Sequence, residues 1–563
     1  MTQRENIRSA LVDAARAIGA ADVDPVVERP RDPAHGEWAT SLALTLAKPL
    51  KAKPRDIAQR LVEHLDLGAS GIAGVEIAGP GFINFRMRAD ATAAGLASII
   101  AADESYGRND AGAGEPVVIE FVSANPTGPL HVGHGRQAAL GDAIASLLEW
   151  TGWKVSREFY YNDAGVQIAN LGASVLARIR QLAGHEANVP DGGYHGEYIR
   201  EIAERYLQQR DETAEQLLAR LEGPEAAGAS ASALLLEELT RFAVAELRKE
   251  QDLDLQSFGV RFDTYYLESS LYTDGSVDET VGALRTEGMT YEKDGAVWLK
   301  TTEYGDDKDR VMRKSDGTFT YFVPDVAYHV TKWRRGYPRA INVQGADHHS
   351  TVTRVRAGLQ ALGMGIPTGY PEYVLHQMVT VTRAGEEVKI SKRAGSYVTV
   401  RDLVDEVGRD AVRYFFLMRK GDSQLVFDVE LAKAQREENP IYYIQMAHAR
   451  MSGIFRVGEI DPATITGEGV DYALLAEPEE QELIKALLDF PALVTGAAES
   501  LEPHRVASYL LETAKLIHLW YHKHHVLNER PEITKARLVL ARASRIVIRN
   551  GLSILGIGAP ERM

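Results

Sequence analysis

The spacing of hydrophobic residues changes twice along the chain. In the first part a helical face is followed by a hairpin pattern, in which Ile83, Phe85 and Met87 alternate with polar residues after the turn Gly79-Pro-Gly81. Further on, apolar runs typical of buried strands alternate with helical patterns, and the last part shows helical spacing only. The pattern predicts an α+β domain, an α/β domain and an all-helical domain, at residues 1–110, 115–436 and 437–563.

The alternation of strands and helices is interrupted between about residues 185 and 250. This stretch is polar, begins near the glycine pair of Asp191-Gly-Gly193 and is rich in glutamate and leucine at helical spacing. We interpret it as a helical insertion carried on the α/β fold. The alternative interpretation, a structural decoration without a part in function, stays open.

The first strand of the α/β domain leads into an informative loop. Val117-Val-Ile119 is typical of a buried strand, and a helical pattern begins near Arg136. A Pro/Gly-rich loop joins this strand to the helix, and His131 and His134 lie where the loop becomes helical. A helix N-terminus presents free N–H groups and partial positive charge, and parallel strands bind ligands at their carboxyl ends. The two histidines are therefore candidate phosphate contacts, with ordinary turn histidines as the alternative.

A second candidate segment lies far downstream. Lys389-Ile-Ser-Lys-Arg393 places three cations close together, after an apolar alternation and a turn at Ala384-Gly385. Clustered cations suit a polyanion such as a nucleotide triphosphate. An isolated run of this kind is usually a solvated basic loop. In combination with the histidine loop, the segment favours a nucleotide site.

Composition narrows the class of protein. The chain has 563 residues, of which 45% are hydrophobic and 25% charged, as is typical of soluble globular proteins. It has no cysteine, which excludes disulfides and thiolate metal sites. The N-terminus lacks a signal-peptide core and no apolar run is long enough to span a bilayer, so we expect a cytoplasmic protein. A net charge of −16 argues against a generic nucleic-acid coat, but it leaves local tRNA contacts open.

The two segments contain His131-Val-Gly-His134 and Lys389-Ile-Ser-Lys392. Together these resemble the two signatures of class I aminoacyl-tRNA synthetases. Other stretches resemble the arginyl enzymes in particular: Phe121-Val-Ser-Ala-Asn-Pro-Thr-Gly-Pro-Leu130, Tyr160-Tyr-Asn-Asp-Ala-Gly165 and Gly558-Ala-Pro-Glu-Arg-Met563. The resemblance implies a Rossmann-like catalytic domain, an N-terminal domain that contacts the tRNA elbow and a helical anticodon-binding domain. It implies ATP-dependent ligation of L-arginine to tRNA(Arg) through an arginyl-adenylate, by a monomer.

The resemblance also implies roles for individual residues. Catalysis falls to His131, His134, Lys389 and Lys392. ATP, accompanied by Mg²⁺ and without zinc, is bound by these four together with Gly133, Gly345 and Asp347. Some family members lack the second loop lysine and carry a compensating lysine before the histidine motif. Here Lys392 is present and Gly128 stands at the compensating position, which supports a catalytic Lys392.

Recognition of arginine requires carboxylates, because the planar guanidinium pairs with two acceptors at once. By resemblance Glu120 and Asp325 face the guanidinium, although Asp325 also fits a helix N-cap after Pro324. The other arginine contacts implied are Ser123, Asn125, Tyr321 and Gln344. A synthetase for another amino acid, and a non-catalytic tRNA-binding protein, are the competing hypotheses. The carboxylate pair argues against the first, and the intact histidines and lysines argue against the second.

The last helical pattern carries a basic stripe. Lys535, Arg542, Arg545 and Arg549 fall within an arc of roughly 80° beside an apolar face, so the pattern predicts a basic face that looks outward. A solvated charged face is the alternative. By resemblance the tRNA contacts are Tyr443, Arg450, Arg542, Arg545 and Met563, and Met446 stands where an aromatic residue is more usual. The nearby His522, His524 and His525 are expected to pack or to contact the backbone, and not to bind a metal.

Overall fold

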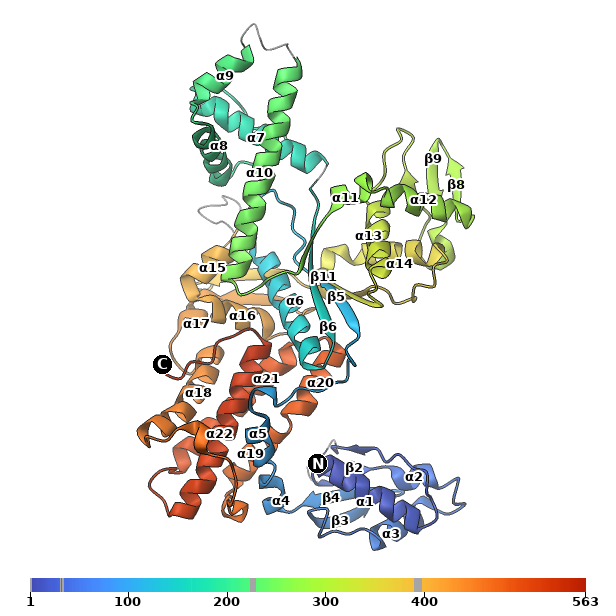
Figure 1. Ribbon diagram of the computed structural model, residues 1–563, viewed down its shortest axis with the longest axis vertical. Coiled ribbons are helices and arrows are strands. Elements are labelled where there is room, and N and C mark those ends of the chain that lie inside the picture. The colour runs from blue at the N-terminus through green and yellow to red at the C-terminus, as the bar shows by residue number, and fades with distance from the viewer. Residues whose placement is uncertain (1–2, 31, 33–34, 164, 223–228, 389–396) are drawn as a thin grey trace.

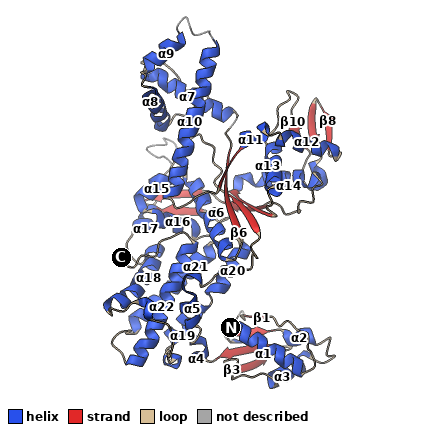
Figure 2. Cartoon of the chain, viewed as in Figure 1, coloured by secondary structure: helices blue, strands red, loops and turns tan. Residues whose placement is uncertain are grey.

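The computed structural model describes residues 3–563 except for residues 31, 33–34, 164, 223–228 and 389–396. A central α/β domain joins a helical bundle at one end and a long helical projection at the other (Figure 1). A separate small domain holds the N-terminus, and the strands lie in this domain, in the centre of the molecule and in a lobe to the right of the centre (Figure 2). In the part of the chain that is described, no helix is both long and apolar enough to cross a membrane.

The N-terminal domain is a four-stranded antiparallel sheet in the order β1-β2-β4-β3. Its elements are α1 (Gln3–Ala17), β1 (Val27–Glu28), β2 (Trp38–Thr40), α2 (Leu42–Leu46), α3 (Pro54–Glu63), β3 (Ile72–Ala78) and β4 (Phe82–Met87). The predicted hairpin is confirmed, since Ala78 pairs with Phe82 across the turn. Ile7, Leu11 and Phe85 are fully buried in the core of this domain, which ends at Met87.

The next segment belongs to a different core. α4 (Ala89–Ala93), α5 (Leu96–Ala102) and the 3₁₀ turn η2 (Asp103–Ser105) pack against the C-terminal helices, and Tyr106 stacks on Phe490 with ring centroids 6.2 Å apart. The sequence pattern assigned these residues to the N-terminal domain. Their apolar side chains, Leu96 and Ile99 among them, instead join the large core shared by the catalytic and C-terminal domains.

The central sheet has five parallel strands in the order β12-β11-β5-β6-β7. They are β5 (Pro116–Glu120), β6 (Lys154–Tyr161), β7 (Thr264–Leu267), β11 (Arg339–Gly345) and β12 (Glu372–His376). Val117 and Ile119 pack on the side of α6 (Val132–Trp150), and Val118 packs on the side of α13 (Phe322–Arg334) and α14 (His349–Ala361). Burial on both faces explains why β5 is apolar at successive positions.

The helical projection consists of α7 (Val166–Leu182), α8 (Glu197–Arg210), α9 (Ala214–Glu222) and α10 (Ala229–Ser257) (Figure 1). It has a core of its own, in which Leu171 and Ile179 of α7 pack with Ile199 and Leu239. The insertion therefore begins with α7, earlier than the polar composition near residue 185 indicated. The apolar face of α7 resembles that of a catalytic-domain helix, which is why composition placed the boundary too late.

A lobe on the other side of the sheet holds a three-stranded antiparallel sheet in the order β10-β9-β8. Besides α13 and α14, its elements are α11 (Glu268–Thr273), α12 (Ser276–Thr286), β8 (Thr290–Lys293), β9 (Ala296–Leu299), the 3₁₀ turn η3 (Thr301–Tyr304), β10 (Arg310–Arg313) and the 3₁₀ turn η4 (Ala346–His348). α11 directly follows β7, so its first residue lies at the carboxyl end of the central sheet.

The chain then passes through a small sheet into the C-terminal bundle. This sheet and its helices are β13 (Val379–Arg383), β14 (Glu386–Glu387), α15 (Val400–Val407), α16 (Arg409–Leu417), β15 (Leu425–Asp428) and α17 (Val429–Lys433). The bundle is α18 (Pro440–Val457), 3₁₀ turns at Pro462–Thr464 and Tyr472–Leu474, α19 (Pro478–Leu488), α20 (Phe490–Ser500), α21 (His504–Lys523) and α22 (Pro531–Ile554). All residues from 437 onward are described and none forms a strand, which confirms the predicted helical domain.

Candidate functional site

Residues 131–134, which we call the histidine turn, cap helix α6. Nδ1 of His131 accepts hydrogen bonds from the backbone N–H groups of Gly133, at 3.0 Å, and His134, at 3.3 Å. In return, Nδ1 of His134 accepts from the backbone N–H of His131 at 3.3 Å, and the two rings stack with centroids 3.7 Å apart. A side chain at Gly133 would meet the His131 ring at 2.8 Å, so the glycine between the histidines is what allows this arrangement.

The hydrogen bonds fix the tautomer of both rings. Because Nδ1 accepts in each ring, the proton of the neutral imidazole sits on Nε2, which can donate to a ligand. Burial lowers the pKa of His131, and burial together with the neighbouring His131 lowers the pKa of His134 well below its usual value. Both rings are therefore neutral donors near pH 7, and they supply hydrogen bonds but no charge.

A third histidine lies beside this turn. His376 ends strand β12, burial lowers its pKa to about 4, and its buried Nε2 has no hydrogen-bond partner among the described residues. The charge of Asp347 acts on both His131 and His376, which places this carboxylate at the same edge of the sheet. Sequence reasoning missed His376. Its position at the end of an apolar strand was the available signal.

Three carboxylates from different elements converge beyond the histidine turn. Glu120 ends β5, Glu268 begins α11 and Asp325 lies in the first turn of α13. Burial first, and then the charges of Glu268 and Glu120, raise the pKa of Asp325 to about 8. The structure thus brings Glu120 and Asp325 together, and it adds Glu268, which sequence reasoning missed although it directly follows a strand.

Glu120 has partners inside the protein. Its Oε1 accepts from the hydroxyl of Ser123 at 3.0 Å, and its Oε2 lies 2.6 Å from Nζ of Lys332. The loop that returns Ser123 to Glu120 is strained, because Val122 and Ser123 have φ angles of 69° and 43°. Such left-handed conformations cost about 1–3 kcal/mol each in residues other than glycine and are concentrated at functional sites. Lys332 was not predicted, although it lies seven residues after Asp325 and hence on the same helical face.

The structure shows different surroundings for the remaining predicted arginine contacts. The amide of Asn125 donates to Gln167 at 2.6 Å, and Oε1 of Gln344 is buried without a hydrogen-bond partner among the described residues. Tyr321 caps α13 and is 74% exposed. Ser123, Glu120 and Asp325 are therefore placed together by the structure.

The structure describes some of the residues that are predicted to bind ATP, but not the lysines of the basic segment. Gly345 ends β11, and Asp347 follows in η4. Lys389 and Lys392 lie outside the described residues.

A cavity of about 540 Å³ separates the histidine turn from the helical projection. Some of the residues in the segments 125–134 and 193–198 line it, together with Tyr397. The hydroxyl of Tyr198 donates to the carbonyl of Thr127 at 2.9 Å, and that of Tyr397 donates to the carbonyl of Pro129 at 3.0 Å. A Cβ atom at Gly128 would lie 3.0 Å from each hydroxyl. The two tyrosine hydroxyls thus enclose Gly128.

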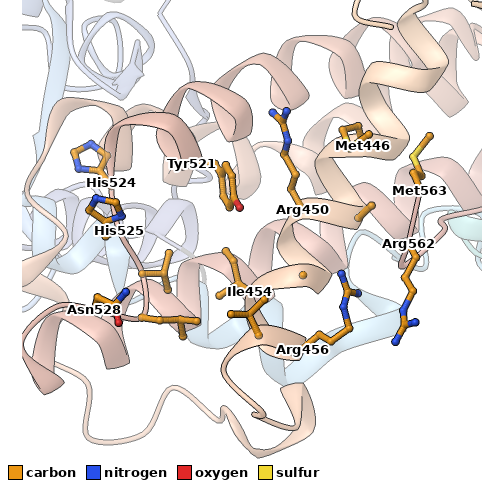
Figure 3. A pocket seen from close by; sticks show the side chains of 15 residues that line it. Met446, Arg450, Ile454, Arg456, Tyr521, His524, His525, Asn528, Arg562 and Met563 are labelled. Atoms are coloured by element: carbon orange, nitrogen blue, oxygen red, sulfur yellow. The ribbon is translucent and has the colours of Figure 1, made fainter. Parts of the chain in front are cut away.

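The C-terminal domain contains a larger cavity, of about 820 Å³, between α18, the end of α21 and the C-terminal residues (Figure 3). Of the predicted tRNA contacts, Arg450 and Met563 line it, and Tyr443 packs against His518 with ring centroids 4.2 Å apart. Tyr521, which sequence reasoning missed, lines the cavity with its ring beneath the Arg450 guanidinium at 5.7 Å. Figure 3 shows the two side chains next to one another, with Arg456 and Arg562 along the lower border.

The expectation that the basic face of α22 looks outward is wrong for its three arginines, whereas Lys535 is exposed. Arg542 and Arg549 pair with Asp103 of η2 at 3.2 Å and 2.5 Å, and Arg545 pairs with Glu561 of the C-terminal tail. The side chains of Arg542, Arg545 and Arg549 are 12%, 22% and 31% exposed. Their acidic partners are remote in sequence or in an irregular tail, so helical spacing alone gave no sign of them.

Of the histidines before α22, His524 has polar partners for both of its ring nitrogens. Nε2 of His524 lies 3.3 Å from Glu479, and its Nδ1 lies 3.4 Å from Arg537. Within the described residues, no three histidines or carboxylates are grouped so as to hold a metal ion.

Comparison with known proteins assigns the chain to a family. Three family models match successive parts: "Arginyl tRNA synthetase N terminal domain" at residues 2–87, "tRNA synthetases class I (R), catalytic domain" at 95–452 and "DALR anticodon binding domain" at 444–563. An arginine–tRNA ligase of Geobacter metallireducens is 55% identical over 542 residues, which are 96% of this chain and 95% of that one. An arginine–tRNA ligase of Cupriavidus necator is 51% identical, over 100% and 99% of the two chains.

A solved structure shares the fold. The arginyl-tRNA synthetase of Thermus thermophilus superposes with a TM-score of 0.73 at 23% identity, and the match covers 100% of both chains. The matched models span the chain almost from end to end, and the histidine turn and the carboxylate pocket lie within the catalytic model. The chain belongs to the arginyl-tRNA synthetase family of class I.

Proposed function

We propose that this chain joins L-arginine to the 3′ end of tRNA(Arg) in two steps at the carboxyl edge of the central sheet. In the first step the carboxylate of arginine attacks the α-phosphorus of ATP, which gives arginyl-adenylate and pyrophosphate. In the second, a terminal ribose hydroxyl of the tRNA attacks the mixed anhydride, and AMP leaves. The observation that carries the proposal is the convergence of Glu120, Glu268 and Asp325 beside the histidine turn, because this concentration of negative charge fits a guanidinium.

The first step needs positioning and charge stabilisation rather than a general base, because its nucleophile is already ionised. His131 and His134 lie at the N-terminus of α6 with their Nε2–H groups free of the capping bonds, so they can donate to phosphate oxygens. Such donors become stronger contacts as negative charge develops on the phosphates. We assign Lys389 and Lys392 to the departing pyrophosphate, and Mg²⁺ enters with ATP as part of the substrate.

At the opposite end of the site, arginine is held by its side chain. The guanidinium faces Asp325 and Glu268, and Glu120 closes the pocket from the end of β5. Gln344 lies near the end of β11 and Asn125 lies in the loop after β5, and we assign their amides to the amino-acid end of the substrate. An uncharged analogue would leave buried carboxylates unpaired, which is costly, so the pocket rejects it without an editing step.

The cavity between α18 and α21 is our candidate for an anticodon nucleotide. Its border carries Arg450, Arg456 and Arg562 for phosphates, and Tyr521 offers an aromatic face for a base. In this arrangement Tyr521 on α21 supplies the aromatic surface that Met446 on α18 does not. The N-terminal domain reaches the tRNA elbow in the same proposal, and the protein acts as a monomer in the cytoplasm.

The direct test is pyrophosphate exchange with each of the twenty amino acids, with and without total cellular tRNA. Exchange with arginine alone supports the proposal, and its dependence on tRNA shows whether tRNA completes the site. Exchange with a different amino acid contradicts the role of Glu120 and Asp325. Protein that binds tRNA but exchanges no amino acid under either condition is the non-catalytic tRNA-binding protein.

A further inference from the structure

Gln251 is a buried polar residue on helix α10, and none of the roles proposed above uses it. It is 1% exposed, and it lies on the same face of the helix as Leu247 and Leu255, which come four residues before and after it. Leu247 packs in the core of the helical projection, and Leu255 packs in the large core shared by the catalytic and C-terminal domains. Gln251 is therefore a polar group where two apolar cores meet, and burial there is costly unless the amide is hydrogen-bonded.

The amide of Gln251 bonds the loop that precedes the histidine turn. Its Nε2 donates to the backbone carbonyl of Asn125 at 3.0 Å and to that of Gly128 at 2.8 Å. Because carbonyl oxygens only accept, the amide has to present its NH2 group, and not its oxygen, to the loop. Its Oε1 is buried without a hydrogen-bond partner among the described residues, which costs free energy. The unpaired oxygen offsets part of the stability that the two bonds contribute, so the clear effect of Gln251 is to bridge the loop.

Residues 125–130 of this loop depend on contacts from other segments. Pro126 and Pro129 have no backbone N–H group, and within the turn the N–H of Thr127 donates to the carbonyl of Asn125 at 2.8 Å. Gln251 bonds two of the loop carbonyls, three residues apart, and so fixes the turn between them. The carbonyl oxygens of residues 127 to 130 accept hydrogen bonds, in that order, from Tyr198, Gln251, Tyr397 and the N–H of Val400.

Helix α10 extends this contact into the projection. It runs as one helix from the far end of the projection to the catalytic domain (Figure 1). Leu235 packs in the core of the projection, and Leu255 in the large core lies about 30 Å further along the helix, at 1.5 Å per residue. Asp254, three residues after Gln251, pairs with Arg401 of α15. Because α10 is packed in both cores, Gln251 holds the loop in a fixed position relative to the projection.

The loop connects the two halves of the proposed active site. It follows Glu120, which belongs to the arginine pocket, and it ends at His131, the first residue of the histidine turn. Asn125 in the loop is assigned above to the amino-acid end of the substrate. In the first step the arginine carboxylate has to approach the α-phosphorus of ATP closely, and a misplacement of about 1 Å can slow such a step by about 10²-fold.

We infer that Gln251 is a positioning residue for adenylate formation: its bonds to Asn125 and Gly128 fix the loop and thereby place the histidine turn relative to the arginine pocket. The inference rests on the proposed function, because it takes arginine and ATP as the ligands of these two halves. Gln251 itself is buried, and it acts on the substrates through the backbone that it bonds.

The experiment is single-turnover formation of arginyl-adenylate by the full-length protein, combined with titration of arginine. Saturating tRNA(Arg) is present, and its terminal adenosine lacks the 2′ and 3′ hydroxyls so that the second step cannot follow. Gln251→Met keeps the length of the side chain and removes both donors. We expect adenylate formation at saturating arginine and ATP to slow by about 10- to 100-fold. Arginine affinity should change little, because the carboxylates assigned to the guanidinium are untouched.

Gln445→Met is the matched control. Nε2 of Gln445 also donates twice, to Asp410 at 3.0 Å and to the carbonyl of Gly558 at 2.9 Å, but this glutamine lies in the C-terminal domain. The substitution should lower the unfolding temperature, as Gln251→Met does, and leave the rate of adenylate formation unchanged. If Gln251→Met also leaves that rate unchanged, the residue is merely structural and the inference is overturned. A loss of arginine affinity as large as the loss of rate would overturn it too, because Gln251 would then act on the pocket.

Gln251→Asn supplies a second measurement if Gln251→Met folds poorly. It keeps the amide and withdraws it by one methylene group, so it cannot bond both carbonyls at their present distances. It should show the same loss of rate with little loss of arginine affinity, and a normal rate would overturn the inference. Unaltered protein that forms no arginyl-adenylate under these conditions would instead refute the proposed function.

Discussion

The hydroxyl of Tyr198 donates a hydrogen bond to the backbone carbonyl of Thr127 at 2.9 Å and thereby ties the helical projection to the loop that precedes the histidine turn. Tyr198 is in the first turns of α8, and Thr127 lies four residues before His131. A hydrogen bond thus connects the core of the projection directly to the loop at the site. Tyr397 makes the equivalent contact to Pro129 from the opposite side.

This pair of tyrosines leads to a prediction for Gly128→Ala. The new Cβ would lie 3.0 Å from both hydroxyls, so it should displace them and slow arginine-dependent pyrophosphate exchange. In a Tyr198→Phe/Tyr397→Phe background both hydroxyls are gone, and the same substitution should have little further effect. A double-mutant cycle on the exchange rate measures this coupling.

Tyr509→Phe is the control for loss of a hydroxyl. It removes a similar hydrogen bond to a backbone carbonyl, that of Ala486 at 2.7 Å, far from the site. It should cost about 1 kcal/mol of unfolding free energy without a change in exchange. Additive effects of Gly128→Ala and the two tyrosine substitutions would show that the hydroxyls do not enclose the glycine.

Lys392→Ala tests the basic loop. We expect adenylate formation to slow by about 10²–10³-fold, the usual loss when one stabilising contact to a developing charge is removed. Arginine affinity should change little, because Lys392 is assigned to the departing pyrophosphate and not to the guanidinium. Single-turnover formation of arginyl-adenylate, together with arginine titration, separates the two effects. Arg383→Ala, which removes a nearby cation paired with Glu406, should be close to normal, and normal adenylate formation in Lys392→Ala would refute the assignment.

The expectation that His131 and His134 act as neutral rings can be tested by the pH dependence of adenylate formation. Burial lowers the pKa of His131 and the pKa of His134. At any pH above these lowered pKa values both rings are neutral and donate from Nε2. At saturating arginine and ATP, the rate of adenylate formation should therefore show no loss between about pH 6 and pH 7, where an unperturbed histidine titrates. A rate that falls with rising pH across this interval would mean that a protonated imidazole is required.

The sequence predicted those features that depend on neighbouring residues. The histidine turn is one: the strand, the loop, the capping histidines and the glycine between them are contiguous, so their pattern already contains the geometry. The parallel-sheet domain and the helical C-terminal domain were predicted for the same reason, because the period of the apolar residues reports local structure.

Contacts between distant segments could not be predicted in this way. Lys332 and Glu120 are 212 positions apart, and Arg549 and Asp103 are 446 positions apart. Nothing in the local pattern of α22 distinguishes an arginine that faces solvent from one that pairs with Asp103, which packs against this helix. Glu268 and His376 were missed for a related reason, because strand order decides which strand ends meet at the site.

The corrected position of Arg542 gives a fourth prediction. If Arg542 acts by holding Asp103, then Arg542→Ala and Asp103→Ala should weaken tRNA binding by similar factors, and the double variant should be no worse than either one. If Arg542 also touches the tRNA, Arg542→Ala should weaken binding further in the Asp103→Ala background. Filter binding of tRNA(Arg), with arginine-dependent exchange as a measure of the intact catalytic domain, distinguishes the two outcomes.

Tyr521 provides the last prediction. Its ring lines the C-terminal cavity beneath Arg450, and stacking of one base on an aromatic side chain contributes about 1–3 kcal/mol. Tyr521→Ala should therefore weaken tRNA(Arg) binding by about 5- to 150-fold, whereas Tyr521→Phe, which keeps the aromatic face, should stay near normal. Met446→Tyr offers a rescue, because it would return an aromatic ring to the same cavity from α18. Equal binding by Tyr521→Ala and the unaltered protein would exclude a stacked base at Tyr521 and direct attention to the arginines on the opposite border.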